Sequence, residues 1–289
     1  MDLNSNANNP GKDVHIALKR SLGLPLITLY GLGTIIGAGI YVLIGEVVGA
    51  SGFLAPMAFI AAAVVAGFTA FSYAELVSRY PLSGGEAVYV ERAFHKPWLA
   101  TVTGWAVALV GVVSSATLAR GFVGYFELFL SLPDILVITV MLLVICTIAA
   151  WGIAQSALVA AVATLLEVGG LAMVIYIASD SFALLPDKLD MMLPSVSVQD
   201  LSFIGVGAFL AFYAFIGFED MVNVAEEVKN PSRTLPIAIC LTLILATVLY
   251  VIISMVAVLA VPASELAENS APLAYIVGSR SASATVWLS

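Results

Sequence analysis

Long apolar runs alternate with short polar segments along most of the chain. Each run is long enough for an α-helix to cross a hydrocarbon core of roughly 30 Å. We expect transmembrane helices at residues 24–48, 53–77, 98–126, 133–151, 156–178 and 201–224. A seventh has Pro236 in its first turn and reaches about residue 261, and the sequence turns apolar again from residue 282. The pattern predicts an all-α, polytopic membrane protein.

Composition agrees with this pattern and narrows the class of function. Hydrophobic residues make up 61% of the chain and charged residues 10%, whereas soluble domains carry about 25% charged residues. The 19 acidic residues outnumber the 11 basic ones, which argues against a nucleic-acid partner. The sequence shows no nucleophile–base pair, metal-ligand cluster or phosphate loop. We therefore expect neither an enzyme nor a protein that needs a cofactor or a metal.

The basic residues predict the orientation of the chain, because cytoplasmic loops carry an excess of lysine and arginine. If seven helices alternate in direction, most of these residues fall on the side of the N-terminus: Lys12, Lys19, Arg20, Arg79, Arg92, Lys96, Lys229 and Arg233. We expect a multi-pass protein of the cell membrane with a cytoplasmic N-terminal tail at residues 1–23. The acidic segment 181–200 is then an extracellular loop, and residues 86–94 form a short amphipathic helix on the cytoplasmic side.

The first apolar run contains five glycines between Gly31 and Gly45, although glycine is a poor residue for a helix interior. Two interpretations fit this stretch. Small residues let two helices pack closely. Alternatively, the helix is broken at mid-membrane, where unwound backbone lines a cavity and offers its N–H and C=O groups to a ligand.

The sixth run favours the second interpretation. It contains Gly217 past its middle, followed by Glu219 and Asp220, and two carboxylates inside an apolar helix are costly. The sixth run starts five runs after the first. If five helices form one repeat, a second copy that starts at the sixth run is inverted in the membrane, because an odd number of crossings separates the two starts. Glycine-interrupted helices at corresponding positions of two inverted repeats indicate the substrate site of a transporter.

Three motifs carry a resemblance to a known family. They are Gly33-Thr-Ile-Ile-Gly-Ala-Gly-Ile-Tyr41 in the first run, Glu75-Leu-Val-Ser-Arg-Tyr-Pro81 with Ser83-Gly-Gly-Glu86, and Phe212-Tyr-Ala-Phe-Ile-Gly-Phe-Glu219 with Glu226-Glu-Val-Lys-Asn-Pro-Ser-Arg-Thr-Leu-Pro236. The chain resembles amino acid permeases of the amino acid–polyamine–organocation (APC) superfamily. The resemblance implies a LeuT-like fold of five plus five inverted helices and secondary active transport of amino acids by alternating access.

The resemblance also implies a domain organisation and an alternative function. Residues 24–180 are expected to form the first repeat, and residues 201–289 an incomplete second repeat with helices 6, 7 and the start of 8. We expect a C-terminally truncated permease, coupled to protons or acting as an exchanger, with protons favoured over sodium. The alternative is a non-transporting membrane fragment or partner subunit of such a permease. A membrane enzyme or channel is disfavoured.

The substrate-binding residues follow from the resemblance. The substrate carboxylate is expected near the backbone N–H groups of Gly37, Ala38 and Gly39, where the positive end of a half-helix favours an anion. The ammonium group is expected near carbonyls that end the preceding half-helix, up to Ile36. Further carbonyls and an aromatic wall are expected from span 6, at Phe215, Ile216, Gly217 and Phe218. For Phe218, simple core packing remains equally open.

Two acidic residues are candidates for coupling or gating. Glu167 lies at the middle of the fifth run, and an ionisable group inside the membrane is a functional hypothesis by default. It is either a proton carrier or a neutral, hydrogen-bonded acid that closes the contact between spans 1 and 5. Glu219 either holds an inner gate or caps the second half of span 6.

Overall fold

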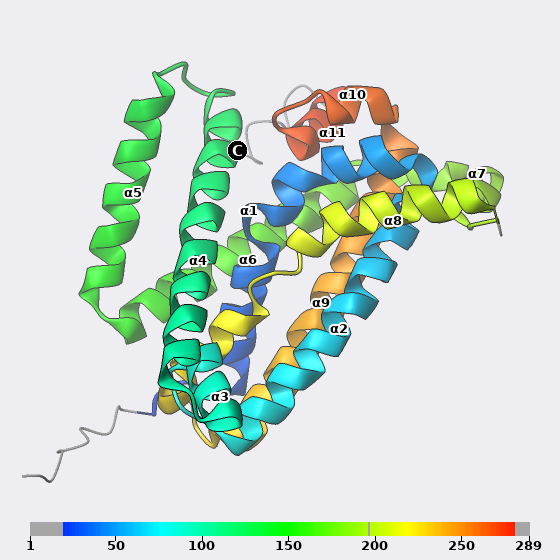
Figure 1. Cartoon of the computed structure of the whole chain (residues 1–289). Coiled ribbons are helices and arrows are strands. Elements are labelled where there is room, and N and C mark those ends of the chain that lie inside the picture. Colours follow the sequence, from blue (N-terminus) through cyan, green and yellow to red (C-terminus); the bar gives the residue numbers. More distant parts are fainter. Residues whose placement is uncertain (1–19, 196, 281–289) are drawn as a thin grey trace, which may run out of the picture.

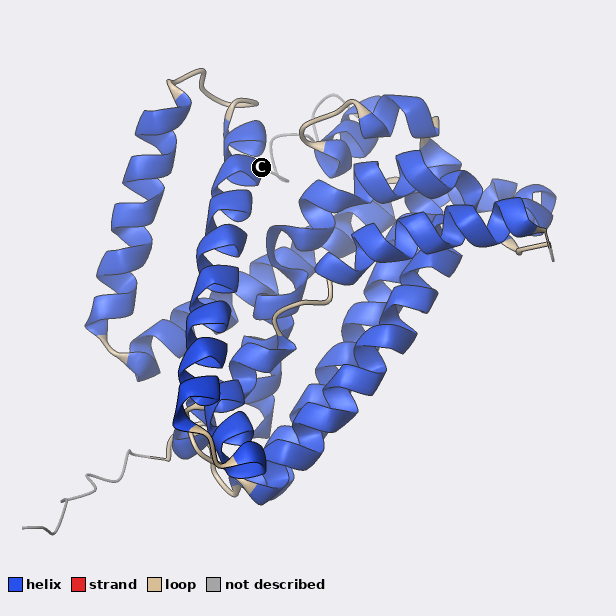
Figure 2. Cartoon of the chain, viewed as in Figure 1, coloured by secondary structure: helices blue, strands red, loops and turns tan. Residues whose placement is uncertain are grey.

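The computed structural model of the protein describes residues 20–195 and 197–280, and the side chains of residues 38, 153 and 154 lie outside the description. In these residues the regular structure is helical, apart from one isolated β-bridge between Leu22 and Val228 (Figure 2). Helices suit a bilayer because each one satisfies its own backbone hydrogen bonds in the absence of water. The expected all-α, polytopic class is thereby confirmed.

The helices follow the expected order along the chain (Figure 1). They are α1 (Leu24–Ser51), η1 (Gly52–Leu54), α2 (Ala55–Arg79), α3 (Gly85–Phe94), α4 (Pro97–Phe126), α5 (Asp134–Trp151), α6 (Ile153–Ile177), η2 (Ser179–Leu184), α7 (Leu185–Met192), α8 (Val198–Tyr213), η3 (Phe218–Glu227), α9 (Pro231–Ala260), α10 (Ala263–Ala267) and α11 (Pro272–Arg280). Within the described residues, six helical segments are long and apolar enough to cross a membrane; one of them, Gly39–Arg79, combines the second half of α1 with α2, and Leu24–Gly37 is a shorter apolar helix.

The expected spans correspond to α1, α2, α4, α5, α6, α8 with η3, and α9. Proline stands in the first turn of α1, α2, α4 and α9, where its missing N–H costs no helical hydrogen bond. The expected amphipathic helix at 86–94 is α3, which begins one residue earlier.

The core forms around α1, which packs against α6, α8 and α9, while α2 lies along α8 and α9 (Figure 1). Its largest fully buried side chains include Ile36, Phe59, Phe215 and Tyr250. In contrast, α4 and α5 expose most of their apolar side chains: Trp105 of α4 is 70% exposed and Ile135 of α5 is 76% exposed. Such surfaces fit contact with lipid chains. Among the described helices, α1 contacts the largest number of other elements.

The segment predicted as the loop 181–200 contains more structure than expected. It holds the end of η2, all of α7 and the start of α8. Pro186 and Asp187 lie in the first turn of α7, where proline and acidic residues are both favoured. Ser197 caps α8 by accepting a hydrogen bond from the N–H of Asp200. The predicted start of an eighth span at residue 282 lies outside the described residues.

Backbone contacts tie the start of α1 to the end of η3. The N–H of Leu22 donates to the carbonyl of Glu227 at 3.0 Å, and the N–H of Lys229 donates to the carbonyl of Leu22 at 2.8 Å. Nearby, the N–H of Glu226 donates to the hydroxyl of Ser83 at 3.0 Å, and the N–H of Ser83 donates to the Glu226 carboxylate at 3.3 Å. The loop after α2 is therefore fixed to the same end of η3.

Candidate binding site at two helix breaks

The break in α1 falls at Gly37, whose dihedral angles, φ 17° and ψ −155°, are not helical. A Cβ added at Gly37 would meet no atom within 4 Å, so packing does not select glycine at this position. The neighbouring glycines differ. A Cβ at Gly39 would lie 3.1 Å from the Cα of Ala214, and one at Gly45 would collide with the carbonyl of Leu266. Both interpretations of the glycine-rich stretch therefore apply, each at different residues.

The break in span 6 lies between Tyr213, where α8 ends, and Phe218, where η3 begins. Gly217 has a φ of 133°, which residues with a side chain rarely adopt. A Cβ on Gly217 would also collide with the carbonyl oxygen of Thr34. The position accepts only glycine on both counts. The N–H of Gly217 donates to the Glu219 carboxylate at 2.8 Å, so this acid caps the second half of the span.

Tyr250 of α9 joins the two breaks. Its side chain is fully buried, and its hydroxyl oxygen lies 2.8 Å from the carbonyl oxygen of Ile35 and 2.9 Å from that of Ala214. The Tyr250 ring packs against Phe215, with ring centroids 5.1 Å apart. The single proton of this hydroxyl can be donated to either of two carbonyls that the broken helices leave without helical partners, or shared between them.

A cavity of about 300 Å³ lies between the two breaks and α4. Its wall includes residues 33–35, Gly37 and Gly39 of α1, the hydroxyl-bearing Ser114 and Ser115 of α4, and Tyr213, Ile216, Gly217, Glu219 and Asp220 of span 6. The hydroxyl of Tyr213 is buried and has no hydrogen-bond partner among the described residues. The volume is at the lower end for small-molecule pockets, about 300–1,000 Å³.

The predicted binding residues separate into two groups around this cavity. Gly37, Gly39, Ile216, Gly217 and Glu219 line it. Ile36, Phe215 and Phe218 have buried side chains in the core, and Phe218 packs against Tyr73 with ring centroids 5.8 Å apart. The side chain of Ala38 lies outside the described residues. The buried side chain of Phe218 fits the core-packing alternative. That the backbone groups of the predicted residues bind substrate stays a prediction.

Sequence reasoning missed Tyr213, Tyr250 and the serine pair of α4. A signal for Tyr250 exists, because a tyrosine inside a transmembrane run requires a partner for its hydroxyl. Its partners are carbonyls more than 30 residues away, at Ile35 and Ala214, so no local pattern identifies them.

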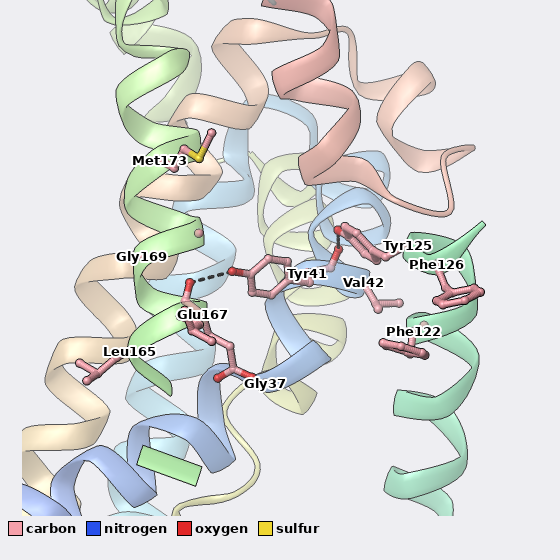
Figure 3. A pocket seen from close by; sticks show the side chains of 13 residues that line it. Gly37, Tyr41, Val42, Phe122, Tyr125, Phe126, Leu165, Glu167, Gly169 and Met173 are labelled. Atoms are coloured by element: carbon pink, nitrogen blue, oxygen red, sulfur yellow. Dashed lines mark hydrogen bonds between the residues drawn. The ribbon is translucent and has the colours of Figure 1, made fainter. Parts of the chain in front are cut away.

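Glu167 faces a second and larger cavity of about 850 Å³, between α1, α4 and α6 (Figure 3). The Oε2 atom of Glu167 is buried and has no hydrogen-bond partner among the described residues. The backbone of Glu167, rather than its carboxylate, joins α6 to α1. Its carbonyl accepts a 2.7 Å hydrogen bond from the hydroxyl of Tyr41. Gly37 belongs to the walls of both cavities, so both lie beside the break in α1.

Comparison with known proteins identifies the family. A sequence profile described as "Amino acid permease" matches residues 22–288. The chain belongs to the amino acid permease family. The expected resemblance to the APC superfamily is confirmed, and the chain is a multi-pass membrane protein of this family.

Several curated relatives extend this result. The branched-chain amino acid permease BcaP of Bacillus subtilis is 30% identical over 286 residues, which cover 91% of this chain and 60% of that protein. The vacuolar cationic amino acid transporter 2 of Arabidopsis thaliana is 32% identical over 265 residues, covering 85% of this chain and 41% of that protein. The methylthioribose transporter of Bacillus subtilis is 28% identical over 260 residues, covering 83% and 55%. The chain thus spans about 40–60% of the length of these relatives.

Proposed function

We propose that the protein carries amino acids across the cell membrane by alternating access, with its N-terminus in the cytoplasm. The observation that supports this most strongly is the cavity enclosed by both helix breaks and α4. Broken helices that face each other at mid-membrane are the typical setting of a transporter's substrate site. The relatives that match the chain are transporters, among them permeases for branched-chain and cationic amino acids.

The substrate's backbone groups bind at the two breaks in this proposal. The half-helix that follows Gly37 directs its positive end toward the cavity and receives the α-carboxylate at the N–H groups of residues 37–39. Carbonyl groups of residues 34–36 and 215–218 receive the α-ammonium group. The unpartnered hydroxyl of Tyr213 adds a polar contact in the same wall. Every amino acid has these backbone groups, so this part of the site is common to all substrates.

Coupling to protons is assigned to Glu167 in the same proposal. An isolated buried carboxylate is costly while it is charged, and a proton removes that cost. Glu167 lies in the cavity that adjoins the substrate site at Gly37, so its charge is sensed there. Glu219 contributes to gating by holding the N–H of Gly217 at the break in span 6.

The test is ligand-induced thermal stabilisation of the protein expressed from its own gene, screened against the common amino acids. A ligand present at about 100 times its Kd stabilises a protein by about 2.7 kcal/mol. Gly37→Leu should abolish this stabilisation, because a Cβ at this position meets no atom within 4 Å and the larger side chain would occupy space beside the proposed binding groups.

Gly205→Leu is the matched control, since Gly205 is an exposed helical glycine of α8 that also has open space around it. This variant should bind like the wild type. Unchanged binding in Gly37→Leu contradicts the site, and stabilisation by no amino acid contradicts the proposed function.

A further inference from the structure

Arg120 lies inside the apolar helix α4, which ends at Phe126. At a rise of 1.5 Å per residue, the Cα of Arg120 is about 9 Å from that end of the helix. The side chain is 73% exposed, on a helix whose exposed apolar surface fits contact with lipid. A charged group at this depth is costly unless its N–H groups find acceptors.

The hydrogen bonding of Arg120 is incomplete. Its one acceptor within residues 20–195 and 197–280 is Asp134 in the first turn of α5, with 3.4 Å between Nη1 of Arg120 and Oδ2 of Asp134. This distance exceeds the usual range of about 2.7–3.2 Å for such a bond. The carboxylate of Asp134 is itself 48% exposed. Both members of the ion pair therefore keep the capacity to bind a further group.

Arg120 lines an open groove of about 630 Å³ between α4 and α5, the helix that stands beside α4 at the edge of the molecule (Figure 1). Residues four positions apart form one face of a helix. The apolar lining includes Ala108, Val112 and Ala116 of α4, each four positions from the next and the last four before Arg120, with Ile138 and Leu142 of α5 opposite.

The length of this groove suits one leaflet of a bilayer. From Ala108 to Arg120 the helix rises about 18 Å, and half of a hydrocarbon core is about 15 Å thick. The hydroxyl of Ser115, which also lines the groove, donates to the carbonyl of Gly111 in its own helix. The groove therefore presents an apolar channel with one cationic group at the end near the α4–α5 turn.

One cation at the end of an apolar channel fits an amphiphile. A phospholipid supplies phosphate oxygens, which match the planar guanidinium of an arginine, and an acyl chain that lies along apolar side chains. Asp134 adds a preference, because its carboxylate repels a headgroup of net negative charge and attracts an ammonium group beside the phosphate. A neighbouring transmembrane helix would instead have to bring its own acceptor for Arg120 into the membrane.

We propose that the groove between α4 and α5 binds a zwitterionic phospholipid whose headgroup joins a phosphate to a primary ammonium group. The phosphate binds Arg120, the ammonium group binds Asp134, and one acyl chain lies along the face of Ala108, Val112 and Ala116. The inference concerns the lipid-facing side of α4 and holds whether or not the protein transports amino acids.

The experiment is a lipid titration of the delipidated protein in detergent, measured by native mass spectrometry. Phosphatidylethanolamine, phosphatidylglycerol and diacylglycerol with the same acyl chains are compared. Phosphatidylethanolamine should bind at least about tenfold more tightly than diacylglycerol, the ratio that one charge-assisted hydrogen bond supplies. Arg120→Gln should remove this ratio, and Asp134→Asn should remove the preference for phosphatidylethanolamine over phosphatidylglycerol.

Two further variants separate recognition of the lipid from a purely structural role. Arg79→Gln breaks another exposed ion pair, that of Arg79 with Glu75, and should bind all three lipids like the wild type. Ala116→Leu fills the groove and keeps the charges, so it should weaken binding of phosphatidylethanolamine. The lipid-free Tm of Arg120→Gln should equal that of the wild type, because an exposed ion pair contributes little to stability.

The occupant of the groove in the membrane is identified by replacing Ala116 with the photoreactive p-benzoylphenylalanine. A crosslinked phospholipid supports the inference. A crosslinked peptide, from a second copy of this chain or from further helices of a longer one, shows that protein covers the groove and overturns it. Equal binding of phosphatidylethanolamine and diacylglycerol, or unchanged binding in Arg120→Gln, overturns it as well. Equal binding of phosphatidylethanolamine and phosphatidylglycerol to the wild type contradicts the zwitterionic class.

Discussion

The backbone of Gly217 lies directly against the carbonyl group of Thr34, so the two helix breaks contact each other without an intervening side chain. A Cβ on Gly217 would also lie 3.1 Å from the backbone nitrogen of Ile35. The neighbours are backbone atoms, which cannot move aside as a flexible side chain does. This contact determines how close α1 and span 6 approach on one side of the smaller cavity.

Gly217→Ala should therefore destabilise the protein. Unfavourable backbone dihedral angles alone cost about 1–3 kcal/mol, and the collision with Thr34 adds to this. Thermal unfolding in detergent measures the effect as a lowered Tm. Gly205→Ala, at an open helical position, should have an unchanged or higher Tm. An unchanged Tm in Gly217→Ala would show that the breaks separate without cost.

Tyr250→Phe removes the hydroxyl that bridges Ile35 and Ala214. The variant keeps the ring and its packing but removes the one proton that the two carbonyls share, and an unsatisfied buried acceptor costs about 1–3 kcal/mol. We expect a lower Tm and weaker amino acid binding, because both breaks lose their common support. Tyr176→Phe is the control, since Tyr176 is 79% exposed. Equal Tm values for the two variants would contradict the bridging role.

Ser83→Ala tests the contact between the loop after α2 and the end of η3. The hydroxyl of Ser83 accepts a hydrogen bond from the N–H of Glu226, and its loss leaves that N–H to solvent. A loss of about 1 kcal/mol corresponds to roughly fivefold faster amide exchange in residues 224–228. Hydrogen–deuterium exchange measures this. Ser78→Ala, at a half-buried serine whose hydroxyl donates to the carbonyl of Glu75, should leave exchange in residues 224–228 unchanged.

Uptake by cells that express only residues 1–289 tests whether this length of chain transports by itself. The two breaks and both cavities lie within the described residues, so amino acid binding is expected from the chain. Accumulation of a labelled amino acid, abolished by Gly37→Leu, would exclude the alternative of a non-transporting fragment or partner subunit. Binding without accumulation would favour that alternative.

The sequence predicted the membrane spans and the family because these depend on local features. Apolar run length determines a transmembrane helix, and the break at Gly37 follows from glycines in a run that otherwise has no need of them. The same pattern could not separate Gly37 from Gly39 and Gly45. Those two are glycines because Ala214 and Leu266 approach them, and such contacts between distant residues leave no local pattern.

The sequence could indicate those parts of the candidate site that are formed by backbone groups. Gly37, Gly39 and Gly217 are recognisable because glycine itself is the signal. Side chains were harder to place, as Phe218 shows: an aromatic residue beside a break suits a cavity wall and a core equally well, and its contact with Tyr73 puts it in the core. The short helix α7 inside the predicted loop 181–200 was also not predicted. Its sequence is short and polar, so it gives no apolar run that would indicate a helix.

The backbone pairing of Leu22 with residues 227–229 gives span 1 a second attachment to span 6, in addition to the contact of Thr34 with Gly217. The first half of α1 is thereby fastened to η3 at both of its ends. We therefore expect the two half-helices to move together, with the backbone bending at Gly37 and at residues 214–217. A probe attached at residue 20 would then report the tilt of η3, although the two are 198 positions apart at the nearest point along the chain.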